Sequence, residues 1–177
     1  CALPILFERH RDHVVTVKNS DGSETRSVEL PGKVHLHQTR KEDEVSTIGM
    51  DRSGLGAIIC SWWIFVEVKA ELEACPNSST EEVRNRMNMA LARMNEFILE
   101  HSFPPTNYEA LEGYISKKIT AISRRKKNPE NWKNGRCLSG FASHFSASAE
   151  VQTREAFEKE IEKALSVPRL PVASPCL

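Results

Sequence analysis

The sequence predicts an α+β fold in which an N-terminal β meander and a central strand pack with three amphipathic helices. Residues 13–38 hold β-branched segments between turn residues, residues 57–72 hold a long apolar run, and apolar residues recur every three or four positions beyond residue 80. The 177 residues are 40% hydrophobic and 27% charged, as is usual for one soluble globular domain. We therefore expect a single domain over residues 1–167 and an extended, proline-containing tail over residues 168–177.

The meander is expected from three short segments, at residues 13–17, 27–30 and 33–37. The first ends at the turn sequence of residues 19–22, the second ends at Pro31-Gly32, and the third alternates polar and apolar residues. Residues 39–47 are mostly charged, and we expect a loop there.

The longest apolar run covers residues 57–66 and is interrupted only by Ser61. A run of this length is too short to cross a bilayer as a helix. It is apolar on both faces, as the central strand of a sheet is, and residues 65–72 then alternate. We expect one strand over residues 57–72 and a weaker one over residues 138–151.

Three helices are expected from their apolar stripes, their capping residues and the prolines that follow them. The first two caps are followed three residues later by glutamate, which completes a capping box. The predicted caps are Ser79, Thr106 and Thr153, and the prolines are Pro104, Pro129 and Pro168.

The cysteines are odd in number and irregular in spacing; they are Cys1, Cys60, Cys75, Cys137 and Cys176. This pattern favours reduced thiols in an intracellular, cytoplasmic protein, with association with a membrane or a virion left open. A disulfide between the two ends, Cys1 with Cys176, is one alternative. The first residues do not have the pattern of a secretory signal peptide. Asn77-Ser78-Ser79 matches the N-glycosylation acceptor pattern, which also arises by chance.

A basic segment at residues 117–136 is the clearest asymmetry of charge. Eight lysines and arginines are opposed there by Glu130 alone, a net charge of +7 in a chain whose total is zero. Such a segment is suited to phosphates, either of RNA or of an anionic membrane surface, and Trp132 can stack on a base or lie at a membrane interface. A solvated helix end is the alternative reading. The candidate binding residues are Lys117, Lys118, Arg124, Arg125, Lys126, Lys127, Trp132, Lys133 and Arg136.

Two histidine pairs, His10 with His13 and His35 with His37, are of a type that binds metal. Nothing in the sequence brings the pairs together, and alternation places His35 and His37 on the solvated face of a strand. We expect neither a metal nor a cofactor.

Cys60 and His144 are candidates for a nucleophile and its base. Residues 60–65 resemble the Cys-Trp-x-Phe segment of papain-like peptidases, except that Ser61 separates Cys60 from Trp62. Because Cys60 is expected in a strand, no helix N-terminus lowers its pKa, and a buried structural thiol is the favoured interpretation.

The expected order of elements resembles that of rhabdovirus matrix proteins. The segment from Trp63 to Leu72, a polar turn, a capped helix, a second helix containing Tyr114 and a later strand–helix pair carry this resemblance. It departs from the family at Pro104-Pro105-Thr106-Asn107-Tyr108, which has one residue too many for a Pro-Pro-x-Tyr budding motif, and it lacks a lysine-rich N-terminal arm. The resemblance implies a self-associating protein that bridges a ribonucleoprotein and a membrane.

These observations together predict a non-enzymatic assembly or interaction protein whose basic segment binds RNA or an anionic membrane surface. Further protein partners and a homo-oligomer are part of this hypothesis. A nucleic-acid-binding regulator and a cysteine-dependent enzyme using Cys60 are the alternatives.

Overall fold

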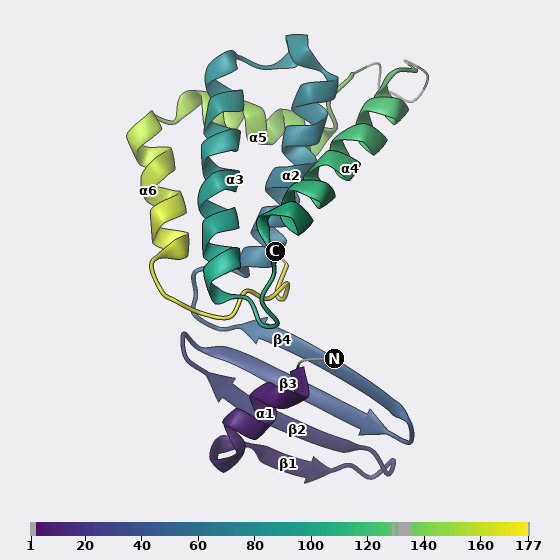
Figure 1. Ribbon diagram of the computed structural model, residues 1–177. Helices are drawn as coiled ribbons and strands as arrows, with labels where there is room; N and C mark the ends of the chain where they lie inside the picture. Colours follow the sequence, from purple (N-terminus) through teal and green to yellow (C-terminus); the bar gives the residue numbers. More distant parts are fainter. Residues whose placement is uncertain (1–2, 129, 131–135, 177) are drawn as a thin grey trace.

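The computed structural model describes residues 3–128, 130 and 136–176, and it places a four-stranded antiparallel sheet beside a bundle of helices (Figure 1). The predicted α+β class is confirmed. Buried apolar side chains form two clusters, one among the helices and one between the sheet and the first helix. The two parts therefore have separate cores, and the contacts between them need their own explanation.

The N-terminal meander is confirmed, with its strands adjacent in sequence order. The strands are β1 (Val15–Lys18), β2 (Glu24–Leu30), β3 (Val34–Lys41) and β4 (Glu44–Asp51). Gly32 turns β2 into β3 with a φ of 77°, a conformation that glycine adopts without strain. The loop predicted for residues 39–47 is wrong, because Thr39 and Lys41 pair with Ser46 and Glu44. Charged side chains on an exposed hairpin stay in water while its backbone pairs, so charge did not exclude a strand.

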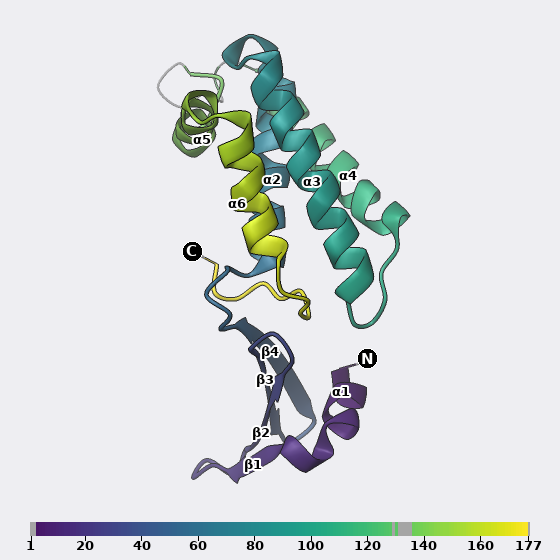
Figure 2. The same cartoon turned by 90° about the vertical axis from the view of Figure 1, so that its left-hand side faces the viewer.

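Helix α1 (Leu3–Arg9) covers one face of this sheet (Figure 2). Phe7 is fully buried there against Val28, Val34 and Leu36. A short 3-10 turn, η1 (Arg11–His13), leads from α1 toward β1. No described helix covers the opposite face, on which Ile48 is 55% exposed.

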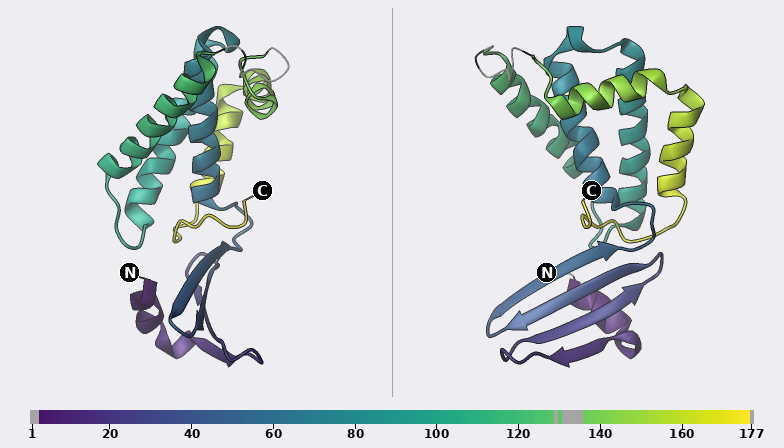
Figure 3. Two further views of the ribbon diagram at one scale, coloured as in Figure 1. Left: turned by 90° about the vertical axis from the view of Figure 1, so that its right-hand side faces the viewer. Right: turned by 180° about the vertical axis from the view of Figure 1, so that it is seen from behind.

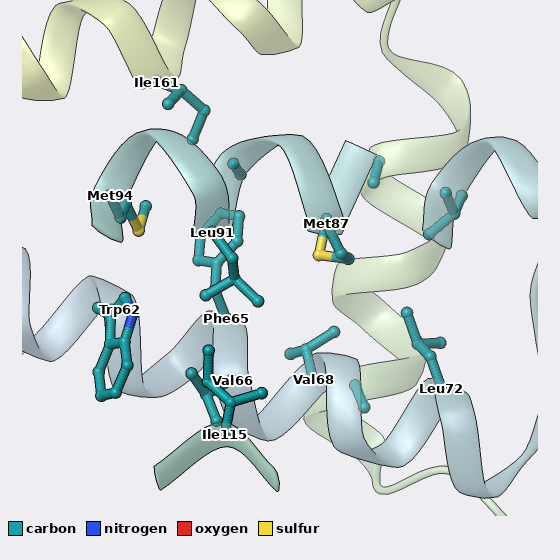
Figure 4. Close-up of a cluster of buried hydrophobic side chains, with 14 of the residues drawn as sticks. Trp62, Phe65, Val66, Val68, Leu72, Met87, Leu91, Met94, Ile115 and Ile161 are labelled. Atoms are coloured by element: carbon teal, nitrogen blue, oxygen red, sulfur yellow. The ribbon is translucent and has the colours of Figure 1, made fainter. Parts of the chain in front are cut away.

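Residues 57–72, predicted as a central strand, instead form helix α2 (Ile58–Ala74). α2 lies inside the bundle, where α3, α4 and α5 contact it (Figures 1 and 4). A helix covered on most sides lacks a polar stripe, so its sequence has the same apolar run as a buried strand. The Trp62 indole is buried and donates a hydrogen bond of 2.7 Å to the Asn95 side chain. Within the described part of the chain, no helix is both long and apolar enough to cross a membrane.

The first two predicted helices are confirmed as α3 (Glu81–His101) and α4 (Tyr108–Lys126). In each helix the capping residue lies one position later than predicted. Thr80, not Ser79, accepts the Val83 amide of α3, and Asn107, not Thr106, accepts the Ala110 amide of α4. The apolar stripes of these helices fill the bundle core together with α2 (Figure 4).

The weak strand predicted for residues 138–151 is wrong, because these residues form α5 (Gly140–Val151). Ser139 caps this helix by accepting the Ala142 amide at 3.2 Å. Its inward side holds Ala142, Ser146 and Ala149, small residues that leave no strong apolar stripe in the sequence. The third predicted helix, α6 (Arg154–Leu165), is confirmed with its predicted Thr153 cap.

Residues 168–176 run in an extended path between the sheet and the bundle (Figure 1, yellow). Val172 accepts the amide of Ile59 at 3.1 Å, at the start of α2. Ser174 pairs with β4 by accepting the amide of Asp51 at 2.7 Å. The segment that was predicted as a tail therefore contacts both parts of the molecule.

Arg169 is the centre of this joint, with a side chain that is 0% exposed. Its Nε donates to the Asp51 carboxylate at 2.6 Å, at the end of β4. The guanidinium also lies 5.5 Å from the ring centroid of Phe97. Its Nη1 and Nη2 donate to three backbone carbonyls, each at 3.0 Å, which are those of Gly56, Ala164 and Val167. This single side chain therefore connects the sheet with α3 and with the end of α6.

Four cysteines are paired, in contrast to the predicted reduced thiols. Cys60 is bonded to Cys176 and Cys75 to Cys137, with Cα atoms 5.3 and 5.9 Å apart. Cys176 thus does not pair with Cys1, which lies outside the described residues. The partners are separated by 116 and 62 residues, so the fold and not the spacing brings them together.

Candidate functional site

The candidate site lies at the end of α4, where the predicted basic segment begins. On one side of this helix Leu111, Ile115 and Ile122 are buried, and the opposite side is polar. The last turn contains Arg124, Arg125 and Lys126, and cations in this position are stabilised by the negative end of the helix dipole.

Lys118 belongs to the side of α4 that faces α2. Its ammonium donates to the Glu67 carboxylate at 3.0 Å, and both side chains are partly exposed. This hydrogen bond raises the pKa of Lys118 above its ordinary value. The positive charge of Lys118 is therefore already matched by an acid within the bundle.

Lys126 is buried, which the sequence did not indicate. Its ammonium lies 3.6 Å from the buried Glu71 carboxylate and donates to the backbone carbonyl of Cys137. Glu71 also accepts the Ser139 amide at 2.6 Å. Hydrogen bonds to a buried ion pair offset the free energy lost when the two charges leave water. Removing one partner leaves an unpaired buried charge and lowers the free energy of unfolding. Lys126 thus anchors residues 137–139 to α2 and is not part of the exposed surface.

The remaining described cations of the segment are exposed, and we call them the α4 cationic surface. Among the described residues, no acidic side chain forms an ion pair with Lys117, Arg124, Lys127 or Arg136. Trp132 and Lys133 lie outside the described residues. The α4 cationic surface consists of Lys117, Arg124, Arg125, Lys127 and Arg136.

An exposed aromatic residue that the sequence analysis missed follows this surface. Phe141 is 55% exposed in the first turn of α5, five positions after Arg136. Its ring lies 6.3 Å from that of Phe145, which packs edge-on against Phe65 of the core at 5.1 Å. α5 runs at the same end of the bundle where α4 ends (Figure 3). The signal was present, since Phe141 falls outside the stripe of small residues, but it is visible only once residues 138–151 are read as a helix.

A groove of about 270 Å³ lies beside these rings, lined by residues of α2, α3, α5 and α6. Phe65, Phe145 and Phe157 line its apolar part, and Ser148 and Glu160 belong to its polar part.

The cysteine-enzyme alternative depended on a free thiol at Cys60. Cys60 does lie in the first turn of a helix, contrary to the expectation, but it is buried and its sulfur is bonded to Cys176. His144 is exposed on α5. A sulfur in a disulfide is not a thiolate nucleophile, so this geometry gives no support to the enzyme.

The histidine pairs stay apart from each other. The rings of His35 and His37 stack 6.5 Å apart on the face of the sheet away from α1, and His35 contacts Glu29 at 2.9 Å. His10 precedes the 3-10 turn η1, and His13 is its last residue. Across the described residues, no group of three or more histidine, cysteine or acidic side chains is arranged to hold a metal.

The two strands on which the resemblance to rhabdovirus matrix proteins rested are helices α2 and α5. The chain was compared with protein-family models, curated proteins and solved structures, and it matches none of them.

Proposed function

We propose that this chain is a non-enzymatic assembly protein that binds an anionic membrane surface through the α4 cationic surface. The observation that carries the proposal is the division of the basic segment. Lys118 and Lys126 are matched by Glu67 and Glu71, whereas the side chains of Lys117, Arg124, Lys127 and Arg136 are exposed. Assembly at a membrane is the one part of the role implied by the resemblance to rhabdovirus matrix proteins that we retain.

Exposed apolar side chains on α5 favour a membrane over RNA as the partner. Phe141 is 55% and Val151 85% exposed. Cations that bind lipid headgroups beside apolar side chains that enter the interface are the usual composition of a peripheral membrane site. RNA offers the same phosphates, and it is the outcome that the test below separates from lipid.

The strength of the attachment indicates why assembly belongs to the proposal. A cation near an anionic leaflet contributes about 1 kcal/mol, so Lys117, Arg124, Lys127 and Arg136 supply roughly 4 kcal/mol per copy. That free energy corresponds to a Kd on the order of 1 mM, which is too weak for one copy to stay bound. Several linked copies would bind far more tightly, so we infer that self-association accompanies membrane binding.

The test is charge reversal of Arg124, Arg125 and Lys127 to glutamate, followed by cosedimentation with vesicles. Lys126 is left unchanged because its reversal would place two acids together in the core. Since each lost cation removes about 1 kcal/mol and each new acid adds repulsion, we expect binding to phosphatidylserine vesicles to fall by more than about a hundredfold.

A control variant carries the same change of net charge on exposed cations in the sheet or directly after its last strand. It reverses Lys18, Arg40 and Arg52. We expect this control to bind phosphatidylserine vesicles like the unmodified chain, and neither protein to bind phosphatidylcholine vesicles. If the α4 variant binds anionic vesicles as well as the control does, the proposal is wrong. Binding to RNA and not to vesicles would replace it with the nucleic-acid alternative.

A further inference from the structure

The connection between α2 and α3 carries an acceptor pattern for N-linked glycosylation on an open surface. A 3-10 turn, η2 (Pro76–Ser78), makes this connection, and it contains Asn77 followed by Ser78 and Ser79. None of the other asparagines in the sequence has serine or threonine two positions later. Asn77 is exposed, and its side chain makes no hydrogen bond with the described residues.

The disulfides are the independent observation that gives this pattern meaning. Cys60–Cys176 and Cys75–Cys137 occupy four of the five cysteines, and Cys75 stands two positions before Asn77. Disulfides form and persist in oxidising compartments and are rare in the cytosol. The cytoplasmic location was predicted from reduced thiols, and that premise is removed. The secretory lumen, where such disulfides form, is also where asparagine acceptors are glycosylated.

We propose that Asn77 carries an N-linked glycan. The Asn77 Nδ2 forms a bond to the anomeric carbon of an oligosaccharide supplied as a polyprenyl diphosphate conjugate. The bond from that carbon to the diphosphate oxygen breaks, the amide nitrogen loses one proton, and the polyprenyl diphosphate leaves. Nothing is oxidised or reduced in this transfer.

The folded structure has room for the product. Pro76, Asn77 and Ser78 are all exposed at the end of the bundle that lies away from the sheet (Figure 1). The Ser79 hydroxyl accepts from Arg84 at 3.0 Å, and Arg84 also donates to the Pro76 carbonyl, so the turn is held from the α3 side. α4 diverges from α2 toward this end, so its last turn lies to one side of the connection (Figure 1).

The experiment expresses the full chain behind a cleavable secretory signal in a eukaryotic cell line. Treatment with peptide N-glycosidase should remove the mass of one glycan and convert Asn77 to aspartate, which peptide mass mapping locates. Asn77→Gln and Ser79→Ala should both abolish the glycan. Ser78→Ala removes a neighbouring hydroxyl from the variable position of the pattern, and it should leave the glycan in place.

Non-reducing mass mapping of the same sample shows whether the two disulfides have formed. A chain with both disulfides but no glycan on Asn77 overturns the inference, and a chain with neither also overturns its premise. If the glycan is lost in the single variant Ser78→Ala as well as in the single variant Ser79→Ala, the conformation of the turn and not the acceptor pattern determines glycosylation. That result would also overturn the assignment. The vesicle assay is performed on enzymatically deglycosylated protein, so the failure of either proposal leaves the other testable.

Discussion

Replacing Arg169 by methionine should be the most damaging single change at the joint between sheet and bundle. Methionine keeps part of the apolar volume and removes five N–H donors. The Asp51 carboxylate, 1% exposed, would then lose its cation, and the carbonyls of Gly56, Ala164 and Val167 would lose a donor. A buried charge left without its partner costs about 3–5 kcal/mol of the free energy of unfolding. Domains of this kind have only about 5–15 kcal/mol in total.

Equilibrium unfolding in urea, followed by circular dichroism, measures this loss. With a slope of about 2 kcal/mol per molar urea, the midpoint of Arg169→Met should fall by about 1.5–2.5 M. Arg52→Met is the matched control, because Arg52 is exposed and adjacent to Asp51 in the chain. Its free energy of unfolding should change by less than about 0.5 kcal/mol.

A double-mutant cycle with Asp51→Asn separates the ion pair from the rest of the packing. The double variant should be more stable than the sum of the two single losses predicts, because the neutral amide no longer needs a cation. If Arg169→Met and Arg52→Met have equal midpoints, the assignment of Arg169 as the link between the two cores is refuted.

Three further changes probe the fold. Replacing Cys75 and Cys137 by serine removes a bridge that closes a 62-residue separation; the chain-entropy model gives a loss of about 4 kcal/mol, measurable as a lower urea midpoint, and an unchanged midpoint would contradict the pairing. Gly49→Ala should lower the melting temperature, because its Cβ would lie 2.5 Å from Val172 Cγ1, and adding Val172→Ala should restore part of it. Gly113→Ala meets open space on α4 and should raise the free energy of unfolding by about 0.5–1 kcal/mol, so a loss there would count against the helix.

The sequence predicted well the elements whose signals are local. The meander follows from β-branched segments and turn residues, and α3, α4 and α6 follow from apolar stripes that continue over several turns. α2 could not be predicted in the same way, because neighbours on most sides remove the polar stripe that identifies a helix. The prediction for α5 failed for a related reason, because its inward face consists of small residues such as Ala142 and Ser146, which do not produce a strong apolar stripe.

The candidate site was predicted in composition but not in arrangement. Spacing along the chain placed Lys118 and Lys126 with the other cations, whereas their orientation on α4 turns them toward Glu67 and Glu71. Which side of a helix faces a partner depends on tertiary packing, which net charge does not encode. The disulfides and the Asp51–Arg169 pair could not be predicted for the same reason, because each joins positions that are distant in the chain and that only the fold brings together.

Arg169 comes 118 positions after Asp51, and this order has a consequence for synthesis at the ribosome. The sheet and most of the bundle emerge before Arg169, the counterion of Asp51, has been synthesised. Until then the Asp51 carboxylate keeps its hydration shell, so the two cores can form separately but cannot close on each other. We expect docking of the sheet on the bundle to be the last event of folding, because it has to wait until Arg169 has been synthesised.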